Sequence, residues 1–104
     1  MKRDIQFSGV LLQYFLIKDH NLDLVYVIGI REYEPYPLQL IRTVPVVSID
    51  EHSGMLKTLF CSYLLGIRIT DVNEQQMYLR VFERRFIEIL DNETIGTTLV
   101  LTLQ

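Results

Sequence analysis

The chain has a single cysteine, no tryptophan and only five glycines in 104 residues. One cysteine, Cys61, cannot form an internal disulfide, and a cysteine-based metal cluster is not expected. The glycines are isolated from one another, so the sequence contains no glycine-rich phosphate loop. It also contains no Gly-x-Ser-x-Gly nucleophile motif. The signatures of common nucleotide-binding and serine-hydrolase sites are therefore absent, and no cofactor is predicted.

Long apolar runs and a surplus of positive charge are also lacking. No stretch reaches about 18 uninterrupted apolar residues, so no membrane span is predicted. The first residues show neither a clean apolar segment nor a small-residue cleavage site, so a signal peptide is not expected and the cytoplasm is the expected compartment. The formal net charge of −3 disfavours non-specific binding to nucleic acid, because such binding depends on excess positive charge.

Apolar residues are abundant, at 49% of the sequence. A small domain has a high surface-to-volume ratio and cannot bury that much apolar surface in one core. We therefore expect a single domain over residues 1–104 whose remaining apolar surface meets another protein. A second copy of the same chain is the first partner to consider.

The first third of the chain predicts a β-hairpin. Ile5–Lys18 and Leu22–Arg31 are rich in β-branched and aromatic residues, and the turn-forming residues 19–21 lie between them. A short buried helix over Ser8–Lys18 is the alternative, because periodicity does not separate strand from helix in so apolar a run.

The middle of the chain begins with a break at residues 34–37, which contain two prolines. Leu38–Ile49 then predicts a strand, in which Pro45 indicates an edge position or a bulge. The following five residues, 50–54, end in glycine and predict a hairpin loop.

The segment after this loop is ambiguous. Met55–Ile69 predicts a strand with a break near Gly66. A helix over Met55–Leu65, ended by Gly66, is the alternative.

The last third predicts one long helix over Asp71–Asp91. Asp71 is a suitable N-cap, with Glu74 three residues later. Apolar residues recur at three- and four-residue steps and form one stripe: Tyr78, Leu79, Phe82, Phe86, Ile89 and Leu90. Thr97–Gln104 then predicts a final strand.

These elements predict an α+β fold. About four strands form an antiparallel β-meander, the long C-terminal amphipathic helix covers one face of it, and the final strand rejoins the sheet.

The favoured function is that of a small non-enzymatic interaction or assembly protein, acting as an oligomer subunit, an inhibitor or an adaptor. Tyrosine is enriched at interfaces, and Tyr33 and Tyr36 flank Pro35 in an expected loop. Apolar residues off the main helix stripe and on the last strand widen the available surface. The interface candidates are Tyr33, Tyr36, Met77, Val81, Ile87, Leu99, Leu101 and Leu103.

Two alternatives remain open. Arg80, Arg84 and Arg85 on the expected helix would suit phosphate in a nucleic-acid-associated regulator, although interleaved glutamates favour a solvated, ion-paired helix face. Alternatively, His20 and His52, with Asp50 beside the latter, lie in two predicted turns. If those turns met, they could form the metal site of a small enzyme.

Overall fold

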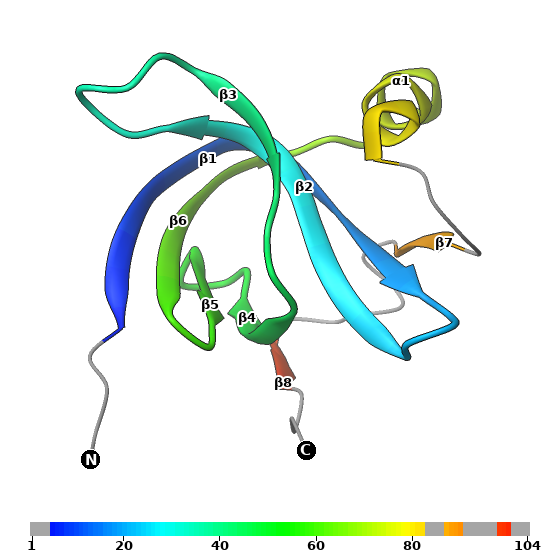
Figure 1. Ribbon diagram of the computed structural model, residues 1–104, viewed down its shortest axis with the longest axis horizontal. Coiled ribbons are helices and arrows are strands. Elements are labelled where there is room, and N and C mark those ends of the chain that lie inside the picture. Colours follow the sequence, from blue (N-terminus) through cyan, green and yellow to red (C-terminus); the bar gives the residue numbers. More distant parts are fainter. Residues whose placement is uncertain (1–4, 83–86, 91–97, 101–104) are drawn as a thin grey trace.

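The chain folds into a curled mixed sheet with one short helix (Figure 1). The computed structural model describes residues 5–82, 87–90 and 98–100, and these residues contain eight strands and helix α1 (Val72–Phe82). The strands are β1 (Gln6–Asp19), β2 (Leu24–Glu32), β3 (Gln39–Arg42), β4 (Val46–Asp50), β5 (Met55–Thr58), β6 (Cys61–Arg68), β7 (Ile87–Leu90) and β8 (Thr98–Val100).

The order of the strands corrects the predicted meander. Along the sheet the order is β3-β2-β1-β6-β5-β4-β8, with β7 paired to β1 off this path. A meander places successive strands side by side, whereas β6 lies next to β1 and runs parallel to it. The prediction of a four-strand antiparallel meander is therefore wrong. The prediction missed the pairing of β1 with β6, two strands that lie far apart in the sequence.

Both predicted hairpins are confirmed. β1 pairs antiparallel with β2, and β4 pairs antiparallel with β5. In each turn the carboxylate of one aspartate, Asp19 or Asp50, accepts backbone N–H groups two and three residues further on, at 2.9–3.3 Å. This local bonding stabilises the turns. The alternative helix over Ser8–Lys18 is wrong.

Two segments predicted as single strands are each divided. Leu38–Ile49 forms β3 and β4, and Pro45 lies in the link between them. Met55–Ile69 contains β5 and β6, so its alternative as a helix is wrong, and the break lies at residues 59–60 instead of Gly66. The side-chain oxygen of Thr58 accepts the N–H of Cys61 at 3.1 Å across this break, which stabilises a turn there.

The helix begins where the sequence predicts and ends much earlier. The Asp71 carboxylate accepts the N–H groups of Asn73 and Glu74 at 2.8 and 3.2 Å, which confirms the N-cap. The helix spans 11 residues and ends at Phe82, and residues 87–90 form a strand on β1. The predicted long helix and the α+β description are therefore wrong, because the described residues are mostly sheet. None of them form a helix long and apolar enough to cross a bilayer.

The sheet buries apolar side chains on both faces. Along β1, Tyr14 and Leu16 lie in one core, whereas Phe15 and Ile17 lie in the other, as the two-residue period of a strand requires. The first core, inside the curl, comprises Leu11, Tyr14, Leu16, Val25, Val27, Val46, Ile49, Leu56 and Tyr63. The second core, which α1 joins, comprises Phe15, Ile17, Tyr26, Ile28, Ile69 and Leu79. Much of the apolar surplus is thus buried within the chain.

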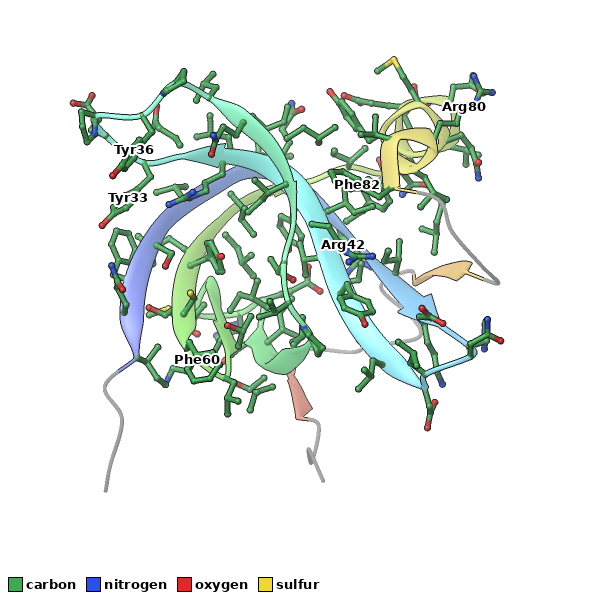
Figure 2. The ribbon with its side chains drawn as sticks, viewed as in Figure 1. Tyr33, Tyr36, Arg42, Phe60, Arg80 and Phe82 are labelled. Atoms are coloured by element: carbon green, nitrogen blue, oxygen red, sulfur yellow. The ribbon has the colours of Figure 1, made fainter. Side chains whose placement is uncertain are left out.

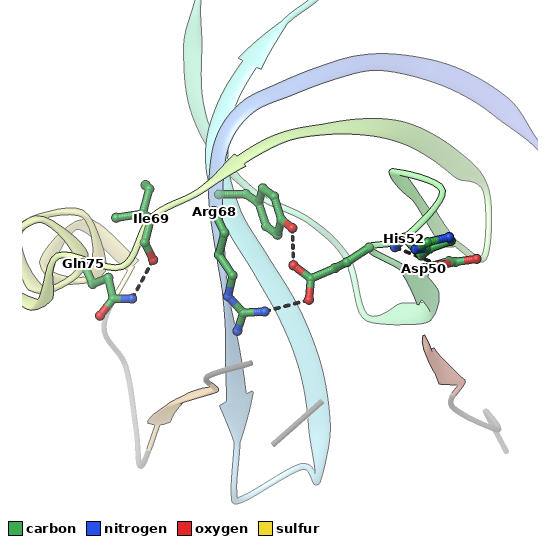
Figure 3. Close-up of polar contacts among 7 residues, drawn as sticks. Asp50, His52, Arg68, Ile69 and Gln75 are labelled. Carbon is green, nitrogen blue, oxygen red and sulfur yellow. Dashed lines mark hydrogen bonds and ion pairs between the residues drawn. The ribbon is translucent and has the colours of Figure 1, made fainter. Parts of the chain in front are cut away.

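Hydrogen bonds connect helix α1 and the link between β3 and β4 to the sheet. The buried Gln75 of α1 donates its side-chain amide to the carbonyl of Ile69 at 2.8 Å, just after β6 (Figure 3). Where β3 leads into β4, Thr43 exchanges two hydrogen bonds with Val27 of β2, at 2.8 and 3.1 Å. We call this Thr43–Val27 exchange the closing contact, because it ties the link before β4 back to β2.

A close approach between β1 and β6 requires glycine at position 66. A Cβ atom on Gly66 would lie 2.3 Å from the carbonyl oxygen of Leu12. At the same point the pairing of β1 with β2 shifts register between Leu11 and Gln13. The register shift in β1 and the glycine at position 66 therefore occur at the same point of the sheet, where the two backbones approach closely.

Candidate functional site

The link between β2 and β3 brings two tyrosines together. The Glu34–Pro35 peptide bond is cis, and the N–H of Tyr36 donates to the carbonyl of Tyr33 at 2.9 Å. The rings of Tyr33 and Tyr36 lie with their centroids 6.0 Å apart and their planes tilted by 33°. The loop thus presents an adjacent pair of aromatic rings.

A third ring comes from the start of β1. The Phe7 ring meets the Tyr33 ring edge to face, with the centroids 6.1 Å apart and the planes at 85°. This geometry is a favourable one for aromatic pairs. Yet Phe7 is 45% exposed and Tyr36 is 58% exposed. We call Phe7, Tyr33 and Tyr36 the aromatic ledge.

An arginine supports the ledge. The guanidinium carbon of Arg31 lies 4.9 Å from the centroid of the Tyr33 ring, within range of a cation–π interaction. Its Nε donates to the carbonyl of Ser8 at 2.7 Å, and Nη1 reaches Gln39 at 3.4 Å. These contacts hold Arg31, and with it the face of Tyr33, in one position.

The backbone of β1 also packs tightly beneath the ledge. Gly9 has a φ of +113°, and a Cβ atom there would lie 2.8 Å from the Cβ of Tyr33 and 2.6 Å from the carbonyl of Glu32. Only glycine fits this conformation and this space. The base of the Tyr33 side chain therefore rests closely on the main chain of β1.

The sequence identified two of the four residues that build this site. Tyr33 and Tyr36 were predicted as interface residues, whereas Phe7 and Arg31 were missed. The available signal was the predicted hairpin itself, because it places the start of β1 beside the end of β2. Val10 pairs with Glu32 in the resulting register. Because the strands are antiparallel, the residues before Val10 and after Glu32 lie on the same side of this pair, which brings Phe7 close to Tyr33.

The other interface candidates do not join the ledge. Met77 and Val81 are exposed, one turn apart on α1. Figure 2 shows Arg80 of the same helix on the opposite side of the molecule from Tyr33 and Tyr36. Ile87 lies on β7, and Leu99 lies on β8, which pairs with β4 in the chain's own sheet. Leu101 and Leu103 lie outside the described residues.

The nucleic-acid hypothesis gains no support from the described residues. Arg80 is exposed on α1, but Arg84 and Arg85, the other two arginines predicted for that face, lie outside the described part of the chain. The helix on which their alignment was based ends at Phe82.

The metal-site hypothesis is not supported either. Within residues 5–82, 87–90 and 98–100, no group of three or more His, Cys, Asp or Glu side chains is placed to hold a metal ion. His52 lies in the turn between β4 and β5, whereas His20 lies in the turn after β1.

The Asp50 carboxylate also has a structural role already. Hydrogen bonds from the backbone N–H groups of Ser53 and, to a smaller extent, His52 lower the pKa of Asp50 below the ordinary range. Figure 3 shows the contact between Asp50 and His52. An aspartate bonded in this way stabilises its turn, which accounts for its place in the sequence.

Tyr14, Glu51 and Arg68 form a polar cluster between β1, β6 and the β4–β5 turn. The hydroxyl of Tyr14 donates to one oxygen of Glu51, and Arg68 contacts the other at 2.8 Å (Figure 3). Burial, and then the hydrogen bond to Glu51, raise the pKa of Tyr14 far above its ordinary value near 10. A tyrosine held protonated is a poor base or nucleophile at neutral pH. This cluster therefore serves to hold the β4–β5 turn against β1 and β6.

Comparisons with known proteins do not supply a family. No family model matches the chain, and no curated protein or solved structure matches it significantly. The function must therefore be inferred from the chain's own residues. Among the surfaces described, the aromatic ledge has the features of a binding site, being aromatic, exposed and firmly held.

Proposed function

We propose that this chain is a small non-enzymatic interaction protein that docks a partner protein through the aromatic ledge. The observation that carries the proposal is that Phe7, Tyr33 and Tyr36 pack against one another while Phe7 and Tyr36 remain about half exposed. Large aromatic side chains are enriched at interfaces and supply many of their energetically dominant contacts.

The support beneath the ledge adds to this argument. Arg31 and Gly9 fix the position of Tyr33 before any partner arrives. A surface that is already ordered loses less conformational freedom on binding, and so retains more of the contact energy as affinity. The arrangement suits a docking surface better than a loop that must order itself.

The proposed activity is that of a subunit, an inhibitor or an adaptor, and we place it in the cytoplasm. The one cysteine is a free thiol, which is in keeping with a reducing compartment. Self-association remains a prediction. Exposed apolar residues elsewhere, such as Leu64 and Ile67 on β6, leave room for a second contact between copies.

The test compares two exposed positions on different parts of the surface. Tyr36→Glu places a charge on the ledge, and Val72→Glu places the same charge on α1. Both side chains are well exposed, so both variants should keep the circular dichroism spectrum of the wild type. Size exclusion with light scattering measures self-association, and quantitative capture from a lysate of the native source measures other partners.

We expect Tyr36→Glu to lose the oligomer or the captured partner and Val72→Glu to retain it. If Tyr36→Glu keeps the wild-type mass and captures every wild-type partner at the same level, the ledge is not the docking surface and the proposal fails.

A further inference from the structure

We propose that the ligand of the aromatic ledge is an extended, proline-containing peptide segment that carries a basic side chain. This inference rests on the proposed function and names the chemistry of the partner. Three features of the ledge support it: its backbone donors, its ring spacing and its flanking charges.

The backbone of the ledge is poorly suited to adding a β-strand. Pro35 and Pro37 have no N–H group, and the N–H of Tyr36 is already bonded to the carbonyl of Tyr33. A peptide that binds as an added strand depends on main-chain hydrogen bonds, which this loop does not offer in a regular row. Recognition here must come mainly from side chains.

A polyproline II segment is the peptide conformation that aromatic side chains recognise without such a row of bonds. It has no internal hydrogen bonds and packs its prolines against aromatic surfaces. It rises about 3.1 Å per residue, so residues two apart are about 6 Å apart along its axis. Successive rings of the ledge have centroids 6.1 and 6.0 Å apart. With three residues per turn, residues two apart lie on neighbouring edges of the segment, so one such pair can contact two adjacent rings of the ledge.

The charges beside the ledge favour a basic ligand. Glu32 and Glu34 are the sequence neighbours of Tyr33, and both are exposed. Neither carboxylate has an ion-pair partner among the described residues. Among the described residues, Arg31 contributes one positive charge at the ledge, and it is held against the Tyr33 ring and the Ser8 carbonyl. An arginine or lysine in the ligand would meet these free carboxylates, whereas an acidic ligand would be repelled.

The experiment selects ligands instead of assuming one sequence. A phage-displayed library of random dodecapeptides is selected on the wild-type chain and, in parallel, on Tyr36→Ala and Leu22→Ala. Leu22 is an exposed apolar residue of the β1–β2 turn and serves as the matched control. Enriched peptides are synthesised, and their dissociation constants are measured by fluorescence anisotropy.

We expect the wild type and Leu22→Ala to enrich peptides with at least two prolines and an arginine or lysine. Tyr36→Ala should bind these peptides at least about tenfold more weakly. Replacing the prolines of a selected peptide by alanine should abolish binding. Glu34→Gln should weaken binding severalfold at low salt and have less effect at high salt, because exposed charges are screened.

Several outcomes overturn the ligand class. Enriched peptides without proline, or no enrichment above the Tyr36→Ala background, would do so. So would a ledge occupied only by a second copy of the chain, which light scattering on Tyr36→Glu detects. In each case the docking function is tested separately, by whether Tyr36→Glu loses the native partner while Val72→Glu keeps it.

Discussion

Tyr14 on β1 donates its hydroxyl hydrogen bond to Glu51, which lies 37 positions later in the turn between β4 and β5. The second oxygen of the same carboxylate contacts Arg68 at the end of β6. One carboxylate in the β4–β5 turn thus joins the neighbouring strands β1 and β6. Tyr14 is only 3% exposed, so the hydroxyl has little access to water as a substitute partner.

Removing this hydroxyl should destabilise the fold. Tyr14→Phe keeps the ring and deletes one hydrogen bond to a charged acceptor, with an expected loss of about 1–2 kcal/mol in the free energy of unfolding. Urea denaturation measures it. Tyr78→Phe is the control, because its hydroxyl lies 3.5 Å from Glu74 at the helix surface and should contribute little. Equal losses in the two variants would contradict the assignment.

The stability of the chain should fall in alkaline solution. An unfolded tyrosine ionises near pH 10, whereas burial, with the hydrogen bond to Glu51, raises the pKa of Tyr14 well above that value. Above pH 10 the unfolded state therefore binds fewer protons than the folded state. The stabilisation is complete below pH 10 and is lost as the pH rises toward the folded pKa, by at most about 1.4 kcal/mol per pH unit.

Burial also raises the pKa of Tyr63, so more than one tyrosine contributes to this loss. Urea midpoints measured between about pH 8 and pH 11 should decline in the wild type and decline less steeply in Tyr14→Phe. A pH titration followed by the ultraviolet absorbance of tyrosinate should show tyrosines in the native chain that ionise well above pH 10. Parallel pH profiles for the two proteins would show that Tyr14 does not retain its proton.

Removing the side-chain oxygen of Thr43 should weaken the closing contact. Thr43→Val removes the acceptor of the Val27 N–H while keeping the shape of the side chain, and both residues are buried. A buried N–H left without an acceptor costs about 1–3 kcal/mol. Thr43→Ser keeps the oxygen and should lose less. Hydrogen exchange at the Val27 amide should accelerate in Thr43→Val alone, and unchanged exchange would refute the role of the hydroxyl.

Gly66→Ala should be harmful although glycine usually weakens a strand. The new methyl group would lie against the Leu12 carbonyl, which is main chain and cannot rotate away. We expect a loss of about 2–3 kcal/mol in unfolding free energy. Ser62→Ala, on the same strand and without such a neighbour, should change it by about 0.5 kcal/mol or less. A Gly66→Ala protein more stable than the wild type would show that the close approach does not exist.

Local chemistry made part of this fold predictable. The turns at Asp19 and Asp50, like the helix start at Asp71, are built from hydrogen bonds between residues two and three apart. Such contacts depend on a few neighbouring residues and are visible in the sequence. The two hairpins and the helix N-cap were accordingly predicted correctly.

The remaining errors come from contacts between distant segments. The spacing of Phe86, Ile89 and Leu90 continues the helical period of α1, and neither glycine nor proline interrupts it, yet residues 87–90 pair with β1. The edge of β1 that they occupy becomes available because β6 extends along only part of that strand. The same limit applies to the ledge. Tyr33 and Tyr36 were visible as neighbours, whereas Phe7 reaches them only through the register of the hairpin.

The parallel pairing of β1 with β6 also has a consequence for how the chain is made. Partners such as Gln6 and Cys61 are about 55 positions apart, and contacts over such distances form slowly because a long loop must close first. At synthesis rates of about 5–20 residues per second, the first strand leaves the ribosome roughly 3–10 seconds before its neighbour exists. During that interval β2 can cover one edge of β1, while the other edge stays open to any strand that arrives. Until β6 has been made, the open edge of β1 is therefore available for pairing with strands of other nascent chains.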